Sequence, residues 1–241
     1  MRGGTGSPLA MTLLYRGVAG TCLGYNSLRA DMKRAIAAER ALAPDGVILL
    51  FLISVGSTFS MHLETSVADE QAMADTEEAV RVAEQIGDDV ALGTAYMARG
   101  LVLSRRNTDA ERKLGLDFLL MGRDVHVQQG ILTTVAMAET RIAELTAEIG
   151  DVDLAIQNAR NVVETLVGSG EMLARSAATA ALVQSLLVRG TPADVEEAAA
   201  EIERLAAVPT EPGFMLNEIQ LLRMRALLAH ATGDEASYRD Y

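Results

Sequence analysis

The sequence predicts an all-α protein in which antiparallel helical hairpins stack into an α-solenoid. A turn residue recurs about every 40 residues, each time between two helix-like apolar patterns. These residues are Asn107, Gly150, Gly190 and Gly233, at intervals of 43, 40 and 43 residues. A constant period of this size is typical of stacked helical hairpins. Within each pattern the apolar residues are three or four positions apart, as on one face of a helix, and no strand-like alternation of useful length occurs.

The apolar patterns form six pairs of helices. We expect these pairs at 9–23 with 27–42, 46–60 with 67–86, 90–106 with 108–127, 131–149 with 152–167, 172–189 with 192–205, and 214–232 with 234–241. The final helix has only eight residues, whereas its counterparts have about 15, so we expect the last pair to be incomplete and the chain to end before the fold does. Residues 1–8 are expected to be disordered, and residues 9–241 to form one helical-repeat domain.

Two early segments each allow a second interpretation. Gly17, Gly20 and Gly24 are spaced like a glycine-rich phosphate loop, but no strand precedes them and no lysine follows, so helix packing is favoured. Val47–Val55 reads VILLFLISV, which is as apolar as a membrane segment. Crossing a bilayer takes about 20 residues, and polar residues flank this run on both sides. The sequence therefore predicts a helix that is buried on all sides.

The turns between the later helices have recognisable capping residues. Gly150 follows the apolar stripe of 131–149, where a left-handed residue closes a helix, and Asp151 can cap the next one. Gly233-Asp234 repeats this turn. After Gly190, Thr191 is expected as an N-cap, with Pro192 and Asp194 at the first and third helical positions. The helix at 172–189 is rich in alanine, which predicts a position inside the stack.

The charge of the chain limits its partners. A formal charge of −12 argues against binding to nucleic acids or to anionic membranes, both of which require basic surfaces. Residues 64–89 carry nine acidic side chains and a single arginine, Arg81. Such a run is usually a solvated helix face, and the alternative is a docking surface for a basic partner. The lone Cys22 excludes an internal disulfide, fits a reducing compartment, and is expected to be a packed thiol rather than a nucleophile.

The sequence contains none of the usual catalytic motifs. The three histidines, His62, His126 and His230, are far apart in the sequence and are expected to be partly exposed surface residues rather than metal ligands. Carboxylates at helical spacing do not face each other across a cleft, as glycosidase chemistry requires. These are Glu77, Glu78 and Glu84, and Glu196, Glu197 and Glu201. The methionines are expected to be core filler, and the examples are Met121, Met137 and Met224. We therefore predict a protein that is not an enzyme, with no catalytic, cofactor-binding or metal-binding residues and with binding residues unknown.

Several segments resemble a known family. The sequence LGTAY at 92–96 matches the Leu-Gly-x-x-Tyr part of a tetratricopeptide repeat, although Asp89 replaces the tryptophan that normally precedes it. Longer segments resemble the C-terminal helical-repeat region of mycobacterial adenylate/guanylate cyclase–ATPase signalling proteins, some of which end in a LuxR-type DNA-binding domain. These segments are Met11–Met32, Glu84–Gly100, Gly168–Met172, Leu205–Leu228 and 233–241.

The resemblance implies the architecture and a regulatory role, but it transfers no catalytic residue. The cyclase aspartates and the ATPase phosphate loop have no counterpart in this sequence. We expect a cytoplasmic, tetratricopeptide-like interaction domain whose partner is a cyclase or ATPase module or a transcriptional regulator. The alternatives are a small-molecule-sensing module, an enzyme with residual activity, or an inactive remnant of a larger protein. Apolar residues around Leu13 and Ala226, expected to be exposed, make self-association possible.

Overall fold

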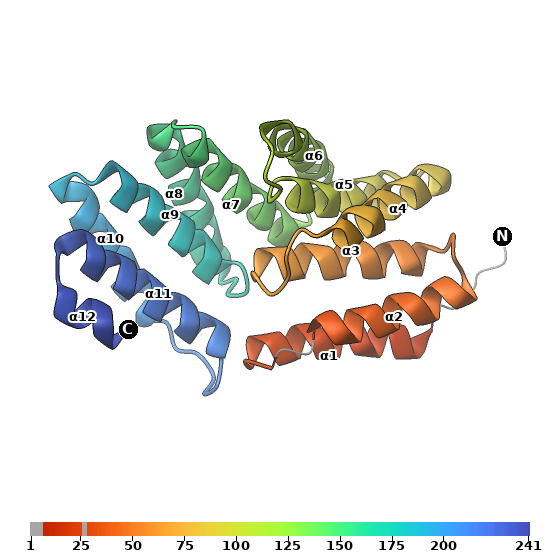
Figure 1. Ribbon diagram of the computed structural model, residues 1–241, viewed down its shortest axis with the longest axis horizontal. Helices are drawn as coiled ribbons and strands as arrows, with labels where there is room; N and C mark the ends of the chain where they lie inside the picture. The colour runs from red at the N-terminus through yellow and green to blue at the C-terminus, as the bar shows by residue number, and fades with distance from the viewer. Residues whose placement is uncertain (1–6, 26–27) are drawn as a thin grey trace. The chain divides into compact units, whose positions relative to one another are not determined.

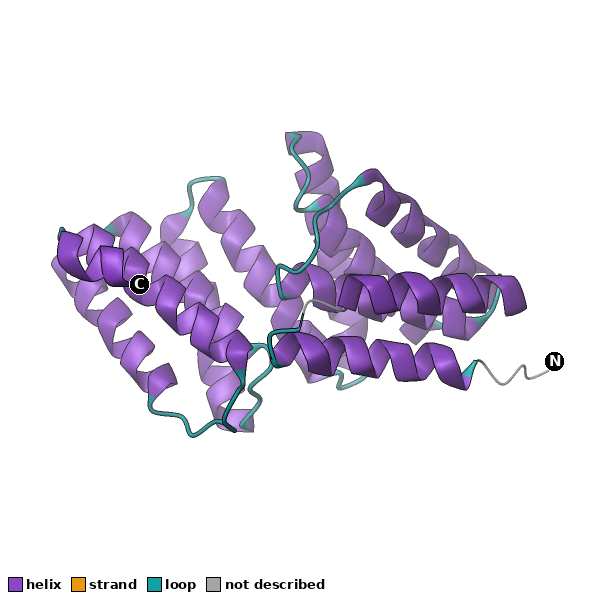
Figure 2. Cartoon of the chain, turned by 60° about the horizontal axis from the view of Figure 1, so that its bottom comes forward, coloured by secondary structure: helices purple, strands orange, loops and turns teal. Residues whose placement is uncertain are grey.

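The computed structural model describes residues 7–25 and 28–241, and within these residues every element is an α-helix (Figure 1, Figure 2). The twelve helices of these two stretches are α1 (Pro8–Cys22), α2 (Leu28–Leu42), α3 (Val47–His62), α4 (Glu70–Ile86), α5 (Asp89–Leu103), α6 (Asp109–Gln128), α7 (Leu132–Glu148), α8 (Val152–Ser169), α9 (Arg175–Arg189), α10 (Pro192–Ala206), α11 (Met215–Thr232) and α12 (Glu235–Asp240). The predicted fold class is confirmed, since helices adjacent in the chain pack against each other in the manner of helix-hairpin repeats.

Local hydrogen bonds set the helix boundaries. Residues 1–6 of the segment expected to be disordered lie outside the described residues, but Ser7 caps α1 and accepts a hydrogen bond from the Ala10 amide. Helix α4 begins three residues later than expected because the Asp69 carboxylate accepts the Ala72 amide at 2.9 Å. Helix α9 also begins later, since the Glu171 carboxylate accepts two backbone amides just before it.

The chain divides into two compact units, which we call unit 1 (Met1–Ala138) and unit 2 (Glu139–Tyr241). In unit 1 the hairpins α1–α2, α3–α4 and α5–α6 each pack internally, and α1 and α5 also contact α3. Ten of the sixteen residues of α3 are buried. Its side chains enter two core clusters, with Leu52 in one and Leu49 and Ile53 in the other, which explains why the apolar run has no polar face. No helix in the described parts of the chain is long and apolar enough to cross a membrane.

Helices α5 and α6 are in contact through their backbones. Gly93 and Gly100 of α5 face Gly122 and Gly115 of α6, and in both helices the two glycines are seven residues apart. A Cβ built on Gly115 would lie 2.4 Å from the backbone nitrogen of Ser104, and one on Gly122 would lie 2.8 Å from that of Met97. A seven-residue spacing keeps both glycines on one face of a helix. The two glycines on each helix therefore let α5 and α6 approach more closely than would be possible with any side chain at these positions.

In unit 2, α9 contacts α8, α10 and α11. Ten of its fifteen residues are buried, which confirms the predicted position inside the stack. The predicted turns are also confirmed. Gly190 and Gly233 have φ of +70° and +73°, a left-handed conformation that glycine adopts without steric cost. Asp151 and Asp234 each cap the helix that follows, with the side chain accepting a backbone amide.

The start of α10 has a complete capping box. Thr191 accepts a hydrogen bond from the Asp194 amide, and Asp194 accepts one from the Thr191 amide at 3.0 Å. Arg189 donates to the same carboxylate at 3.0 Å. The hydrogen bond from Arg189 holds the pKa of Asp194 well below its ordinary value, so this buried carboxylate stays charged.

Replacing Thr191 with alanine is expected to reduce the free energy of unfolding by about 1 kcal/mol, because one amide at the start of α10 loses its acceptor. Thermal unfolding followed by circular dichroism measures this loss. The Thr191→Ser variant keeps the hydroxyl and should retain the stability of the parent. Equal losses in both variants would show that the hydroxyl is not the stabilising group.

Ion pairs connect the second helices of consecutive hairpins. In unit 1 they join α2 to α4, and in unit 2 they join α8 to α10. The pairs are Arg40 with Asp75 and Glu78, Arg160 with Glu197, and Glu164 with Arg204. The partners are 35 to 40 residues apart in the sequence, which is close to one hairpin period. Exposed pairs of this kind each contribute between about 0 and 1 kcal/mol, so they orient neighbouring hairpins more than they stabilise them.

Candidate functional site

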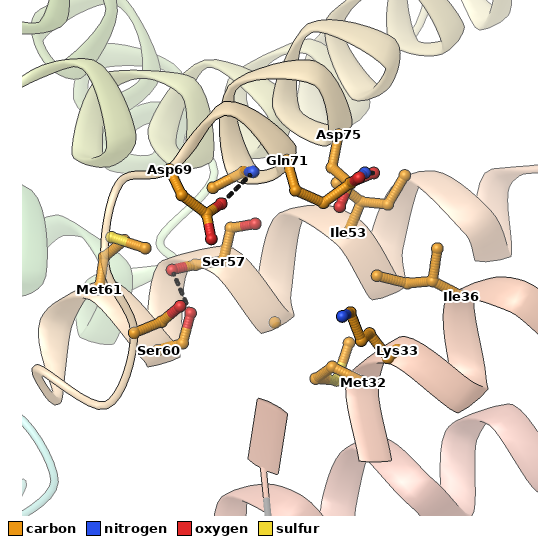
Figure 3. A pocket seen from close by; sticks show the side chains of 13 residues that line it. Met32, Lys33, Ile36, Ile53, Ser57, Ser60, Met61, Asp69, Gln71 and Asp75 are labelled. Atoms are coloured by element: carbon orange, nitrogen blue, oxygen red, sulfur yellow. Dashed lines mark hydrogen bonds between the residues drawn. The ribbon is translucent and has the colours of Figure 1, made fainter. Parts of the chain in front are cut away.

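Unit 1 contains a cavity between α2, α3 and the beginning of α4. Its volume is about 250 Å³. Figure 3 shows the side chains that line it: Met32, Lys33, Ile36, Ile53, Gly56, Ser57, Ser60, Met61, Ser66, Asp69, Gln71, Ala72 and Asp75. The cavity forms where the connection from α3 to α4 is longer than the other turns within hairpins, so that α4 starts some distance from the end of α3.

One wall of the cavity is apolar. Met32 of α2 and Ile53 and Met61 of α3 are buried, and Ile36 of α2 is partly buried. Gly56 gives Met32 the room it needs, since a Cβ at this position would lie 2.4 Å from the Met32 methyl carbon. Methionine side chains are flexible and polarisable, so this wall can adapt to the shape of an apolar group.

The other wall carries carboxylate, amide and hydroxyl groups. Asp69, the N-cap of α4, accepts the Ala72 amide with one carboxylate oxygen, and its carboxylate points into the cavity (Figure 3). Six residues after Asp69, Asp75 accepts hydrogen bonds from Gln71 at 2.9 Å and from Arg40 at 3.1 Å. Hydrogen bonds from Arg40 to Glu78 and then to Asp75 raise the pKa of Arg40. Arg40 therefore compensates much of the charge of Asp75.

A single cation and several hydroxyls complete the lining. Lys33 reaches from the exposed side of α2 toward the space below α4 (Figure 3). Ser57 lies on the α3 side of the cavity. The Ser60 hydroxyl donates back to the Ser57 carbonyl oxygen at 3.2 Å, and Ser60 is thereby held in its own helix. The cavity thus combines a lysine and two aspartates with an apolar wall.

The acidic run at 64–89 is neither fully solvated nor fully available for docking. Glu70 forms an ion pair with Arg106 at 2.7 Å, and Asp75 and Glu78 pair with Arg40. The interpretation as a solvated helix face is therefore wrong for Asp75 and Glu78, which are partly buried and hold α2, whereas Glu70 stays largely exposed despite its ion pair.

The histidine prediction was wrong for two of the three residues. His62 and His126 are buried, while His230 is exposed and contacts Tyr238 in a tilted arrangement with ring centroids 5.3 Å apart. Burial, with a smaller contribution from Arg105, lowers the pKa of His62 to about 3. Its Nε2 forms no hydrogen bond with a described residue.

His126, in contrast to His62, is buried with a partner at each ring nitrogen. Its two ring nitrogens lie 3.2 Å from the Thr94 hydroxyl and 2.7 Å from the Thr134 hydroxyl, so the imidazole links α5, α6 and α7. Burial lowers the pKa of His126. Within the described ranges, no three His, Cys, Asp or Glu side chains come together as metal ligands.

The cysteine, the paired glutamates and most of the methionines discussed from the sequence take part in packing or ion pairs. Burial raises the pKa of Cys22, which fits the expected packed thiol. Glu197 and Glu201 form ion pairs with Arg160 and Arg204. Met137 and Met224 belong to the core as expected, but Met121 is 43% exposed, so the expectation of core packing is wrong for Met121.

The expected exposure is wrong for Leu13 itself, although Leu9 and Tyr15 near it are exposed, as are Ile219 and Leu222 near Ala226. Leu13 is buried in the core cluster between α1, α2 and α3, and Ala226 is partly buried. Gly17 is a buried residue within α1 and Gly24 follows the end of that helix, so neither belongs to a phosphate loop. None of these positions lines the cavity.

None of the residues that line the cavity was predicted from the sequence to form a binding site. Their only signal was the longer connection between the second pair of expected helices, at 60–67. Comparison of the chain with protein-family models, with curated proteins and with solved structures finds no match. Within residues 7–25 and 28–241, the fold is an all-helical domain in which the helices pack in sequence order.

Proposed function

We propose that this chain is a non-catalytic helical-repeat domain that regulates a protein partner by binding it, and that the cavity in unit 1 receives part of that partner. One observation carries the proposal: three consecutive helices line a cavity of about 250 Å³ with apolar side chains on one wall and polar ones on the other. A mostly preformed cavity with a few oriented polar groups is the usual form of a recognition site. Stacked helical hairpins commonly present such surfaces to other proteins.

The resemblance of the quoted segments motivates a more specific proposal. The partner would be the cyclase or ATPase module of a mycobacterial-like signalling protein, or a transcriptional regulator, in the cytoplasm. The acidic composition supports a protein partner rather than a nucleic acid, because no excess of basic residues is present to neutralise phosphates.

The test is binding of the purified chain to purified cyclase and ATPase modules of such proteins, measured by biolayer interferometry. Ser57→Leu places a larger side chain in the cavity and is expected to weaken binding at least about tenfold, which corresponds to roughly 1.4 kcal/mol. Ser169→Leu, at the exposed end of α8, is the matched control and should bind like the parent. Absence of binding, or equal binding by both variants, would refute the proposal. ATP turnover by the chain alone is expected to equal the buffer background.

A second candidate function is sensing of a small molecule. It is favoured by the presence of Lys33 and Asp69 on the same cavity, since a zwitterion could bind both charges. A ligand that binds only the folded state raises the melting temperature. Thermal-shift measurements with amino acids and related zwitterions, in the parent and in Ser57→Leu, separate this candidate from the first. A shift seen in the parent and absent from the variant would support sensing.

A further inference from the structure

We infer that the cavity binds a single cationic side chain, a lysine or arginine of the partner, and this inference rests on the proposed function. It assigns the chemistry of the occupant, which the proposed function leaves open. Three properties of the cavity carry it: its volume, the division of its lining into two walls, and the sign of the charge around it.

The volume favours one side chain over a whole cofactor. Pockets that hold drug-sized ligands and cofactors enclose about 300–1,000 Å³. The cavity in unit 1, at about 250 Å³, is smaller than this range. A nucleotide would therefore extend out of it, whereas one long side chain of a peptide could be accommodated.

The apolar wall matches the stem of such a side chain. Met32, Ile36, Ile53 and Met61 offer aliphatic and thioether surface from two helices. Lysine and arginine carry three or more methylene groups that bury readily against apolar surface while the charged end reaches polar groups. An acidic side chain has a much shorter stem and would leave this wall uncovered.

The polar wall matches the charged end. Asp69 supplies a carboxylate, Gln71 an amide oxygen and Ser57 a hydroxyl, whereas Asp75 is already paired with Arg40. Ammonium and guanidinium groups are donors only, so a wall rich in acceptors suits them. Hydrogen bonds between such a donor and a carboxylate are roughly twice as strong as neutral ones. Figure 3 shows the Asp69 carboxylate directed into the cavity, where it would meet the cation.

The surrounding charge acts in the same direction. The cavity lies at the beginning of the acidic run 64–89, in a chain of formal charge −12, and a field of this sign attracts basic segments from a distance. Lys33 is the opposing charge at the cavity. It weakens binding of a cation, and its removal should therefore strengthen binding. If the occupant were zwitterionic or anionic, Lys33 would contact it. Removal of Lys33 should then weaken binding.

The experiment is a selection from a random-peptide display library on the full chain, followed by fluorescence anisotropy with the selected peptides. We expect one position of the peptides to be enriched in lysine or arginine. Asp69→Asn removes the charge but keeps an oxygen to cap α4, since asparagine caps helices as well as aspartate. This variant is expected to bind the selected peptides at least about tenfold more weakly.

Asp88→Asn is the matched control. Asp88 caps α5 and accepts the Ala91 amide at 2.9 Å, the same distance as between Asp69 and the Ala72 amide, but it does not line the cavity. Both variants lose one negative charge from the acidic run, so a difference between them isolates the cavity from the general field. Lys33→Gln is expected to bind roughly two- to fivefold more tightly.

The outcomes separate the inference from the proposed function. Selected peptides that lose binding in Ser57→Leu but share no basic position, or that bind Lys33→Gln more weakly, would overturn the inference while a binding function stands. Equal binding by Asp69→Asn and Asp88→Asn would also overturn it. If the selection gives no binders, or if Ser57→Leu binds every selected peptide like the parent, both the inference and the proposed function fail.

Discussion

Substitution of Gly115 by alanine is expected to lower the free energy of unfolding of unit 1 by about 2 kcal/mol or more. A Cβ at this position would lie 2.4 Å from the backbone nitrogen of Ser104 and 3.0 Å from the carbonyl oxygen of Gly100. Backbone atoms cannot avoid the contact by a rotamer change, so α5 and α6 must separate along their length. Alanine gains about 1 kcal/mol over glycine in helix propensity, and the steric cost must exceed this gain.

Urea denaturation followed by circular dichroism measures the loss. Gly168→Ala is the matched control, because Gly168 lies in α8 and a Cβ at this position would meet no packed neighbour within 4 Å. There the same substitution should raise stability by about 0.5–1 kcal/mol, through helix propensity and a less flexible unfolded chain. If both variants were equally stable relative to the parent, the close backbone contact of α5 with α6 would be disproved.

Acidic pH is expected to destabilise unit 1 through His62. The loss of unfolding free energy should be comparable in size to the loss expected for Gly115→Ala. The folded-state pKa of His62 is about 3, against an ordinary value of 6.5. Between these values the unfolded chain binds a proton that the folded chain does not, so stability falls as pH decreases. The stabilisation is fully present above pH 6.5 and is lost at up to about 1.4 kcal/mol per pH unit toward pH 3.

The His62→Leu variant removes this titration. At neutral pH it should lie within about 1 kcal/mol of the parent, because it exchanges a buried imidazole with an unpartnered Nε2 for an apolar side chain. Two pH units below 6.5 it should be more stable than the parent by about 2–3 kcal/mol. Denaturation curves at several pH values measure the difference. The control is His230→Asn on the exposed surface of α11, expected within about 0.5 kcal/mol of the parent at neutral pH. Parallel pH profiles for the parent and His62→Leu would contradict the burial of a neutral imidazole.

Helix positions and turns could be read from the sequence because their causes are local. The Gly190 turn, the Thr191 cap and the apolar steps of each helix depend on residues a few positions apart. The apolar run in α3 allowed a prediction that is only partly correct, because most of the helix is buried but Val47 is 55% exposed and Phe51 and Val55 are partly buried. The residues that determine each of these features lie within about ten positions of one another in the sequence.

The cavity and the buried histidines could not be predicted in this way. Whether His62 faces the core depends on how α3 lies against its neighbours, which the period of its own helix does not reveal. The cavity needs Met32, Asp69 and Gly56, which come from three separate segments. The same holds for Arg40 of α2, because its partners Asp75 and Glu78 lie on a different hairpin. In each case the decisive contact joins one hairpin to the next.

The ion pairs between α2 and α4 and between α8 and α10 have a consequence for evolution. Their partners are separated by 35 to 40 residues, so a change of charge at Arg40 or Arg160 alters the selective constraint on a position about one hairpin further along the chain. Among descendants of this sequence, compensating charge reversals should therefore concentrate at that separation. A correlated pair of this kind would mark the junction between two hairpins even after the rest of the sequence had diverged.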